Sequence, residues 1–172
     1  NVIINASGPW VNDVIRRCGR TQQLAVDLVQ GTHIVLQKQI SPQCFYLEAH
    51  DHRAVFVLPW YDQTLVGTTE SIFNGNPAET QPTEPEVQYL LDTVRKHFPH
   101  ADLTIANQFS GLRVLPASGE RAFLRNRDTQ FLDDEGLISL YGGKLTAYRA
   151  TAEHLLMHVQ KHLGKRRVIA DT

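Results

Sequence analysis

The N-terminal residues change from a continuous apolar run to a helical pattern. The run Val2-Ile3-Ile4 predicts a strand that is buried on both faces, and the turn Ala6-Ser7-Gly8-Pro9 ends it. Apolar residues at positions 10, 11, 14 and 15 then form one edge of a helix predicted over 10–18, which Gly19 is suited to end.

The stretch that follows alternates apolar and polar positions, as half-buried strands do. A strand is predicted over 24–36, continuing past Gly31, and shorter strands are predicted over 45–47, 54–58 and 64–67. Only short polar spacers such as His50-Asp51-His52-Arg53 separate them. Spacers of this length are typical of an antiparallel meander.

The second half of the chain adds two helices and further strands. Thr83 with Glu86 three residues later forms a capping box, and the helix it starts is ended by Pro99. Strands follow over 103–109 and 137–141, with a hairpin pairing 122–124 to 130–132. A long helix comes after Gly142-Gly143, and its apolar stripe is Leu145, Tyr148, Ala152, Leu155, Leu156, Val159 and Leu163. Together the elements predict an α+β fold with a mixed, mostly antiparallel sheet and packed helices.

Composition and charge remove several classes of function. The 172 residues are 42% hydrophobic and 20% charged, with a formal net charge of −1, so the chain lacks the basic surface that non-specific nucleic-acid binding needs. No apolar run has the length of a membrane-spanning helix. Cys18 and Cys44 have no CxxC spacing, which predicts free thiols in a reducing compartment. Because the chain opens on a strand rather than on Met or a signal peptide, we expect a single domain, 1–172, excised from a longer protein.

Two glycine-containing motifs are the first candidates for chemistry. Gly142-Gly143-Lys144-Leu145-Thr146 joins a strand to a helix, where glycines admit a ligand to the backbone and the helix N-terminus attracts phosphate or an electron-rich carbonyl. Ser110-Gly111-Leu112-Arg113 is expected at the end of a strand, where a guanidinium suits a carboxylate or phosphate. An ordinary strand–helix junction and a structural ion pair are the alternatives that stay open.

Basic side chains elsewhere are weaker candidates. His33 lies in an apolar strand, where a satisfied core histidine is the more frequent outcome. Arg125 and Arg127 would face one side of a strand and could clamp an anion, with a solvated basic edge strand as the alternative. Histidines recur at 154, 158 and 162 without an acidic partner in that stripe, so we expect a solvated face and no metal site.

Five motifs, taken in order, resemble those of the flavin-dependent glycerol-3-phosphate dehydrogenases. Asn5-Ala6-Ser7-Gly8-Pro9-Trp10 is similar to NATGPW, and Gly31-Thr32-His33-Ile34 is similar to GSHI. Gly67-Thr68-Thr69-Glu70 matches GTTD/E, residues 110–113 match SG[VIL]R, and residues 142–149 are close to GGKLTTYR. The resemblance covers nearly the whole chain, with Val114 standing where the family usually has Pro.

The resemblance implies the fold of a two-domain, D-amino-acid-oxidase-like FAD oxidoreductase. Residues 11–135 would form the substrate-binding part, while 1–10 and 136–163 would complete the FAD domain, whose remaining segments would be a partner of this chain. The GxGxxG dinucleotide fingerprint does not occur in the sequence, so we expect FAD in the full-length protein and not on this fragment. The implied reaction oxidises sn-glycerol 3-phosphate to dihydroxyacetone phosphate by hydride transfer to flavin, with electrons passed to quinone.

The resemblance also implies roles for individual residues. His33, Arg113 and Lys144 would be catalytic, with His33 or Lys144 as the base for the C2 hydroxyl. Arg127, or Arg125 in its place, would bind the phosphate, with His33 approaching the substrate. The cofactor would contact Ser7, Gly8, Gly142, Gly143, Lys144, Leu145 and Thr146.

Location and alternatives follow from the same resemblance. We expect a cytoplasmic enzyme, peripheral to the inner face of the bacterial cell membrane, with a homodimer left open. An FAD-dependent amine or amino-acid oxidase of the same fold is one alternative, and its substrate needs one Arg for a carboxylate rather than a cluster of cations. A non-catalytic anion-binding module is the other.

Overall fold

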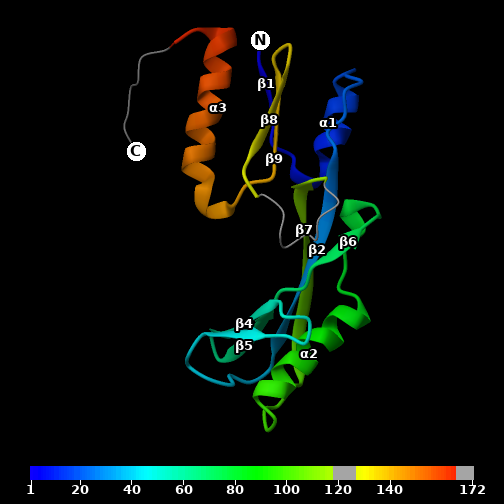
Figure 1. Ribbon diagram of the computed structural model, residues 1–172, viewed down its shortest axis with the longest axis vertical. Coiled ribbons are helices and arrows are strands. Elements are labelled where there is room, and N and C mark those ends of the chain that lie inside the picture. Colours follow the sequence, from blue (N-terminus) through cyan, green and yellow to red (C-terminus); the bar gives the residue numbers. More distant parts are fainter. Residues whose placement is uncertain (118–126, 166–172) are drawn as a thin grey trace. The chain divides into compact units, whose positions relative to one another are not determined.

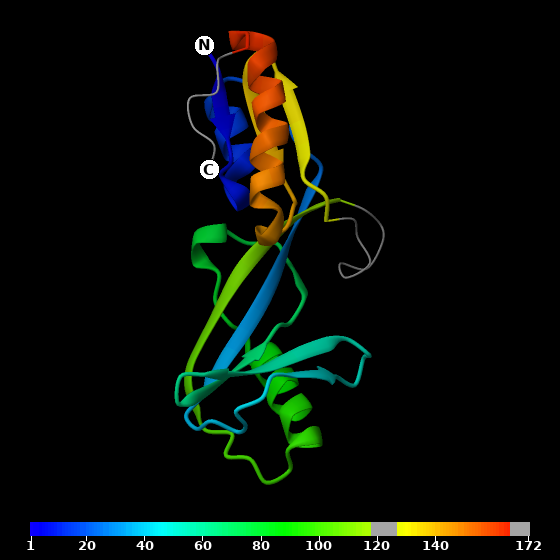
Figure 2. The same cartoon turned by 90° about the vertical axis from the view of Figure 1, so that its left-hand side faces the viewer.

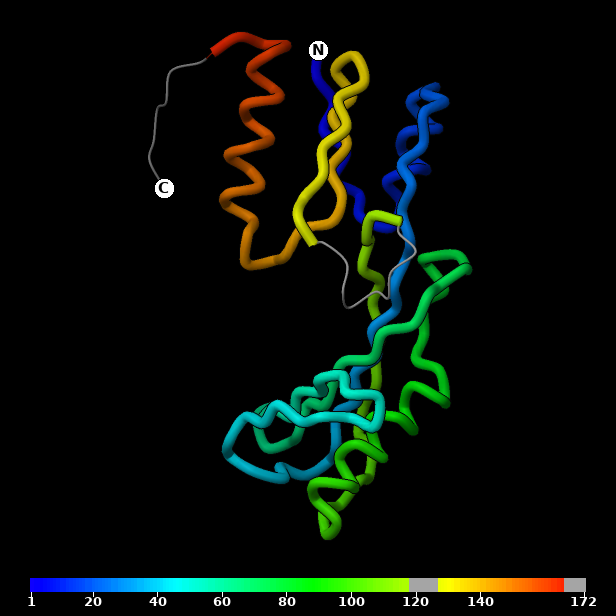
Figure 3. The backbone as a smooth tube through the Cα atoms, viewed as in Figure 1, coloured from blue at the N-terminus to red at the C-terminus, as the bar shows by residue number. Residues whose placement is uncertain are grey.

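The computed structural model describes residues 1–117 and 127–165, and these belong to two compact units (Figure 1). One unit comprises Asn1–Asp27 with the chain from Arg113 onward, and the other is Leu28–Leu112. The boundary falls within two paired strands, β2 (Val26–Leu36) and β7 (Ile105–Pro116). The expected α+β class is confirmed, although the strands form two sheets instead of one. Figure 3 follows the chain through both units.

The Leu28–Leu112 unit is built on an antiparallel meander. Its strands are β3 (Phe45–Glu48), β4 (Ala54–Trp60) and β5 (Gln63–Gly67), and the sheet order is β3-β4-β5-β2-β6. The meander agrees with the alternation in the sequence. The short strand β6 (Ser71–Phe73), which the sequence did not predict, pairs antiparallel with β2 through Leu28 and Phe73.

Helix α2 (Glu84–His97) covers one face of this sheet. The sheet contributes Ile34, Leu36, Val55, Val57 and Val66 to the core, and the helix contributes Val87, Leu90 and Val94. All eight side chains are buried, because the two-residue period of the strands and the helical period of α2 direct apolar positions to one shared layer. A short 3-10 turn, η2 (Pro77–Glu79), precedes the helix (Figure 2).

The other unit contains a three-stranded mixed sheet in the order β1-β9-β8. Strand β1 (Ile3–Asn5) is parallel to β9 (Leu137–Tyr141), and β8 (Gln130–Asp134) is antiparallel to β9. Helix α1 (Val11–Arg17) follows the 3-10 turn η1 (Gly8–Trp10) and packs Val11 and Ile15 against Leu137. Helix α3 (Tyr148–Leu163) follows the 3-10 turn η4 (Leu145–Ala147) and lies against β8, where His158 stacks on Phe131.

Burial in this unit corrects the prediction for β1 and shows that the apolar stripe of α3 is open. Ile3 is 53% exposed and Ile4 is 50% exposed, so β1 is not buried on both faces. Helix α3 has no buried residue, and most of its predicted stripe is exposed, with Leu145 at 89% and Tyr148 at 72%. The prediction for β1 was wrong, and in β1 and α3 alike no described element packs over these exposed apolar positions. None of the described helices is long and apolar enough to cross a membrane.

Two further predictions concern the surroundings of β8. Strand β8 pairs with β9, and the predicted pairing of 130–132 with 122–124 stays a prediction, because 122–124 lies outside the described residues. The face of α3 that carries the histidines was predicted to be solvated, yet His158 stacks on Phe131, and His162 Nε2 lies 2.8 Å from Asp133 Oδ2. The aromatic ring and carboxylate of β8 supply those contacts, and helical periodicity alone gives no sign of them.

Candidate functional site

His33 lies on the sheet face opposite α2. In the strand register His33 pairs with Gly67, Gly67 with Phe56, and Phe56 with Tyr46. Side chains of directly paired residues stand on the same face of a sheet. Tyr46 is 71% exposed and Phe56 is 46% exposed, so His33 stands on an open face of the sheet, separated from this aromatic pair by Gly67.

Gly67 and Phe109 fix the place of the His33 ring. A Cβ at position 67 would lie 2.7 Å from both Cγ and Nε2 of His33, closer than real carbon contacts allow. On its other side the imidazole stacks on Phe109, with ring centroids 5.1 Å apart and an interplanar angle of 7°. The glycine of the Gly67-Thr68-Thr69-Glu70 motif is therefore required by the close approach of His33.

The two motifs around His33 are joined by hydrogen bonds. The Thr32 backbone N–H donates to Thr69 Oγ1 over 2.9 Å, and the Thr69 N–H donates to the Thr32 carbonyl over 3.3 Å. Arg53 supports the same segment, because its Nη1 donates to the Glu70 carbonyl over 3.1 Å. Motifs that are more than thirty residues apart in sequence thus share one hydrogen-bonded junction.

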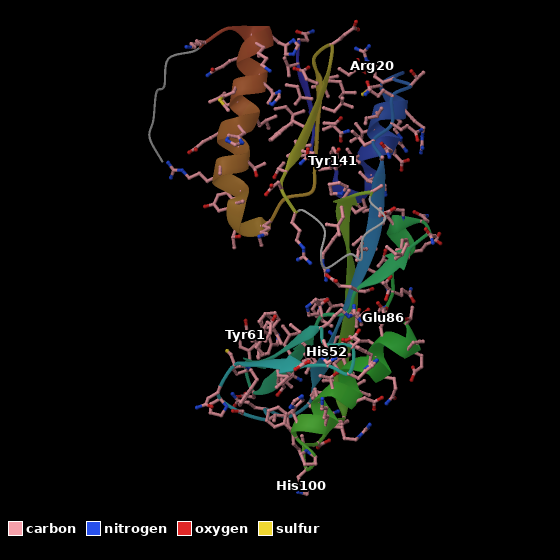
Figure 4. The ribbon with its side chains drawn as sticks, in the orientation of Figure 1. Arg20, His52, Tyr61, Glu86, His100 and Tyr141 are labelled. Atoms are coloured by element: carbon pink, nitrogen blue, oxygen red, sulfur yellow. The ribbon has the colours of Figure 1, made fainter. Side chains whose placement is uncertain are left out.

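Glu86, the third residue of α2, closes this junction from the helix side (Figure 4). It is only 6% exposed, and its carboxylate accepts from Thr69 Oγ1 at 2.8 Å and from Thr32 Oγ1 at 2.9 Å. Burial by itself would raise the pKa of this carboxyl, but the hydrogen bonds from Thr69, Thr32, Gln30 and Thr83 outweigh burial and lower it. The group is therefore an anion at neutral pH.

Glycines also bring two loops together in the unit that contains α3. Gly142 and Gly143 have φ values of +74° and +83°, which favour glycine. A Cβ on Gly142 would lie 2.9 Å from the Asp128 carbonyl oxygen, and a Cβ on Gly143 would lie 2.5 Å from Thr129 Oγ1. The loop that carries Arg127 therefore lies directly against the loop that carries Lys144.

The junction after β9 differs in detail from the predicted one. Lys144 is exposed and precedes η4, where the Ala147 N–H donates to the Lys144 carbonyl over 2.9 Å. The α-helix begins only at Tyr148. Leu145 and Thr146 lie in the 3-10 turn with their side chains exposed. The glycines thus lead into a 3-10 turn and not straight into an α-helical N-terminus.

The turn after β1 is organised by Asn5, which is 2% exposed. Its Nδ2 donates to the Val11 carbonyl over 2.9 Å and to Ser139 Oγ over 3.0 Å. Its Oδ1 accepts from Ser7 Oγ over 2.6 Å. Gly8 has a φ of +56°, and a Cβ there would meet nothing within 4 Å, so the turn leaves open space beside its backbone. This geometry fits the close approach of a cofactor.

Two of the predicted site arginines, Arg113 and Arg127, lie in or near the strands β7 and β8. Arg113 is half-buried inside β7, which continues to Pro116, so the prediction that the motif ends a strand was wrong. Arg127 precedes β8 in a loop rather than in a strand, and Arg125 lies outside the described residues.

In the described part of the chain no His, Cys, Asp or Glu side chains gather as a metal site. The convergence of His33, Arg113, Arg127 and Lys144 stays a prediction, since His33 belongs to one unit and the three cations to the other.

Sequence reasoning missed several residues that fix the geometry around His33 and in the turn after β1. Gly67 was noted only as part of a motif, Glu86 only as a helix cap, and Phe109 only as an apolar strand position. Their roles depend on strand register and on contacts between distant segments. A signal was available for Asn5 alone, since Asn before a Ser-Gly-Pro turn indicates a side chain that bonds to the following backbone.

Comparisons with known proteins agree with this picture. Residues 1–155 match the model of the DAO family, described as FAD dependent oxidoreductase. D-erythritol 1-phosphate dehydrogenase of Brucella abortus is 35% identical over 94% of this chain and 35% of its own length. Aerobic glycerol-3-phosphate dehydrogenase of Escherichia coli is 33% identical over 90% of this chain and 33% of its own length. The chain thus spans about a third of the length of these relatives.

Solved structures show the same fold. The glycerol-3-phosphate dehydrogenase of Bacillus halodurans, complexed with FAD, has a TM-score of 0.81 at 29% identity and covers 98% of this chain and 34% of its own. Glycine oxidase of Geobacillus kaustophilus has a TM-score of 0.61 at 16% identity, covering 99% of this chain and 43% of its own, which is a likeness of fold alone. With a family model matched along most of its length, this chain belongs to the FAD-dependent oxidoreductases.

Proposed function

We propose that the protein containing this chain is an FAD-dependent dehydrogenase that oxidises sn-glycerol 3-phosphate to dihydroxyacetone phosphate. The observation that carries the proposal is the packing of the Arg127 loop on the glycine pair before Lys144, which groups two cations on neighbouring backbone segments. The relatives that match this chain at 33–35% identity are named for phosphorylated polyol substrates. A phosphate dianion suits clustered Arg and Lys side chains.

Different residues of this chain would hold the cofactor and take the proton of the substrate. FAD, when bound, supplies the acceptor for the hydride. The open turn at Ser7-Gly8 and the Gly142-Gly143-Lys144 junction are the places where this chain would hold it. His33 is held between Gly67 and Phe109 with a defined ring position, as a base that takes a hydroxyl proton requires.

A second substrate is suggested by one relative of the same identity. D-erythritol 1-phosphate dehydrogenase matches at 35% identity, and glycerol-3-phosphate dehydrogenase of Pseudomonas aeruginosa also matches at 35%. Both substrates present a phosphate and a polyol, so an Arg127 contact would serve either one. The two substrates differ in the length of the polyol, so their relative turnover distinguishes a glycerol 3-phosphate from an erythritol 1-phosphate dehydrogenase.

The test uses the full-length, FAD-loaded enzyme with an artificial electron acceptor. We expect turnover of sn-glycerol 3-phosphate, with a kcat/KM at least tenfold above that for D-erythritol 1-phosphate. Glycine and sarcosine serve as the substrates of the amino-acid-oxidase alternative. Turnover of glycine or sarcosine without turnover of either phosphate would contradict the proposal, and the reverse order of the two phosphates would assign the second substrate.

The electron acceptor and location are further proposals that rest on the resemblance. We propose a quinone acceptor and a place at the inner face of the bacterial cell membrane. Quinone reduction by the full-length enzyme, and its recovery in the membrane fraction at low salt, are the corresponding measurements. A fully soluble enzyme that does not reduce quinone would contradict both.

A further inference from the structure

Glu86 accepts more hydrogen bonds than a helix cap requires. Of the two reciprocal bonds of a capping box, only one ends on the carboxylate, from the N-cap N–H, and here Thr83 N donates to Glu86 Oε2 over 3.3 Å. The carboxylate also accepts from five side chains, over 2.6 to 3.0 Å. These side chains are Gln30 and Thr32 of β2, Thr69, Ser71 of β6, and Thr83.

The charge of Glu86 is balanced by these donors. Among the described residues no Lys or Arg forms a salt bridge with it. Its position as the third residue of α2 places the anion at the positive end of the helix dipole. A buried carboxylate with this many donors fixes its partners, because moving any one of them leaves a charged hydrogen bond unmade.

The bonds lead from Glu86 to the residue next to His33. The Thr32 hydroxyl donates to Glu86, and the Thr32 N–H and carbonyl are both bonded to Thr69, whose own hydroxyl donates to the same carboxylate. Thr32 is therefore linked to Glu86 directly through its hydroxyl, and through its N–H and carbonyl by way of Thr69. His33 follows at once and projects from the opposite face of β2, against Gly67 and Phe109.

We propose that Glu86 is a positioning residue for His33, acting from behind the sheet through Thr32 and Thr69. This inference rests on the proposed function in one respect, since it takes His33 to be the group that contacts substrate. Glu86 does not itself reach the open face on which His33 stands. It holds the two motif segments, 31–34 and 67–70, in one register, so that the imidazole keeps its place beside Gly67.

A matched pair of threonines separates positioning from stability. Thr32 and Thr64 are 0% and 1% exposed and lie in the same sheet. The Thr64 hydroxyl donates to the Lys38 carbonyl and accepts from the Ile40 N–H, each over 2.9 Å, and takes no part in the Glu86 network. Thr32→Val and Thr64→Val each remove one buried hydroxyl at nearly constant shape, while Thr32→Ser keeps the hydroxyl at position 32.

The kinetic measurement is made on the full-length, FAD-loaded enzyme. We expect both valine variants to lower the melting temperature by similar amounts. Thr32→Val should also lower kcat about 10- to 100-fold, as a displacement of about 1 Å can do, while Thr64→Val keeps kcat within about twofold. Thr32→Ser should restore most of the lost kcat. Equal kcat for the two valine variants would overturn the proposal.

A second measurement needs neither substrate nor turnover. NMR of 13C-histidine in the same full-length protein, with His33 assigned through His33→Gln, reports the ring-current shift from the stacked Phe109. We expect Glu86→Gln and Thr32→Val to change the His33 signal, and Thr64→Val to leave it in place. An unchanged His33 signal in Glu86→Gln would overturn the positioning role.

The two measurements distinguish this inference from the proposed function. If the wild-type enzyme oxidises neither phosphate, the proposed function fails while the NMR result still decides the positioning role. If the wild type is active and the His33 signal is insensitive to Glu86, the positioning role fails alone.

Discussion

The two units of the chain differ in how much of their apolar surface is buried. In Leu28–Leu112, ten hydrophobic side chains are buried in one cluster built mainly from the sheet and α2. In the unit formed by the two ends of the chain, the corresponding cluster among the described residues consists of Val11, Ile15 and Leu137. Its last helix, α3, buries none of its residues, and β1 leaves two isoleucines half exposed. One unit carries its own core, and the other presents an apolar face that no described residue covers.

The contrast extends to polar groups. In the Leu28–Leu112 unit a buried anion, Glu86, joins a helix, two strands and a loop. The other uses a neutral amide, Asn5, and glycine contacts between loops. We infer that Leu28–Leu112 is rigid around His33 by its own contacts. The unit with Lys144 is expected to depend on further segments of the full-length protein for its rigidity.

Removing the buried anion should have the largest effect. Glu86→Ala leaves Gln30, Thr32 and Thr69 without their acceptor, and we expect a loss of about 3–5 kcal/mol in the free energy of unfolding of Leu28–Leu112. Glu84→Ala, on the exposed side of the same helical turn, is the control and should cost less than about 1 kcal/mol. Chemical denaturation of the full-length protein measures both. A loss below about 1 kcal/mol in Glu86→Ala would mean that water replaces the carboxylate without cost.

The same group predicts a pH dependence. The folded-state pKa of Glu86 is below its ordinary value of 4.5. Its contribution is therefore fully present above pH 4.5 and is lost as pH falls through the lower, folded-state pKa. Wild-type protein should lose more stability than Glu86→Gln between about pH 5 and pH 3. Parallel pH profiles for the two proteins would contradict the assignment.

The sequence predicted elements better than it predicted their surroundings. Strand β2 and helix α2 were predicted because alternation, a capping box and Pro99 are local signals. Burial of β1 on both faces was predicted from its apolar run and proved wrong, and the apolar stripe of α3 is likewise mostly exposed, since a hydrophobic pattern shows which face is apolar and not what covers it. The role of Glu86 was out of reach, because its donors come from positions 30, 32, 69 and 71 as well as from its own turn.

In the less enclosed unit, the cations should affect kinetics more than stability. Arg127→Ala in the full-length enzyme should raise KM about 10- to 150-fold, a loss of about 1.5–3 kcal/mol, because phosphate charge does not change during hydride transfer. Lys144→Ala should instead lower kcat, since its ammonium would face the reacting hydroxyl, where charge develops. Steady-state kinetics on both variants measures this split. If Arg127→Ala lowers kcat with KM unchanged, Arg125 becomes the residue to test for phosphate.

The tight packing around His33 predicts a smaller loss of stability. Gly67→Ala forces the imidazole away from the strand, because the added methyl group would lie 2.7 Å from Nε2. We expect a loss of about 1–3 kcal/mol in unfolding free energy, together with a lower kcat. Gly111→Ala is the matched control, since a Cβ there meets nothing within 4 Å. Equal effects of the two alanines would show that the ring moves aside freely.

The smallest effect is expected on the open helix, and it depends on what surrounds the chain. Leu156 is 52% exposed, so Leu156→Ala in the 172-residue chain should change the unfolding free energy by less than about 0.5 kcal/mol. We propose that segments of the FAD domain outside this chain cover the α3 stripe in the full-length protein. The same substitution should then cost about 2–3 kcal/mol there, as for other buried leucines. Leu90, which is 0% exposed in the other unit, is the control, because Leu90→Ala should cost about 2–5 kcal/mol in either context. An equally small effect of Leu156→Ala in both proteins would mean that the stripe stays open to solvent, and that the contrast between the two units is a property of the whole enzyme.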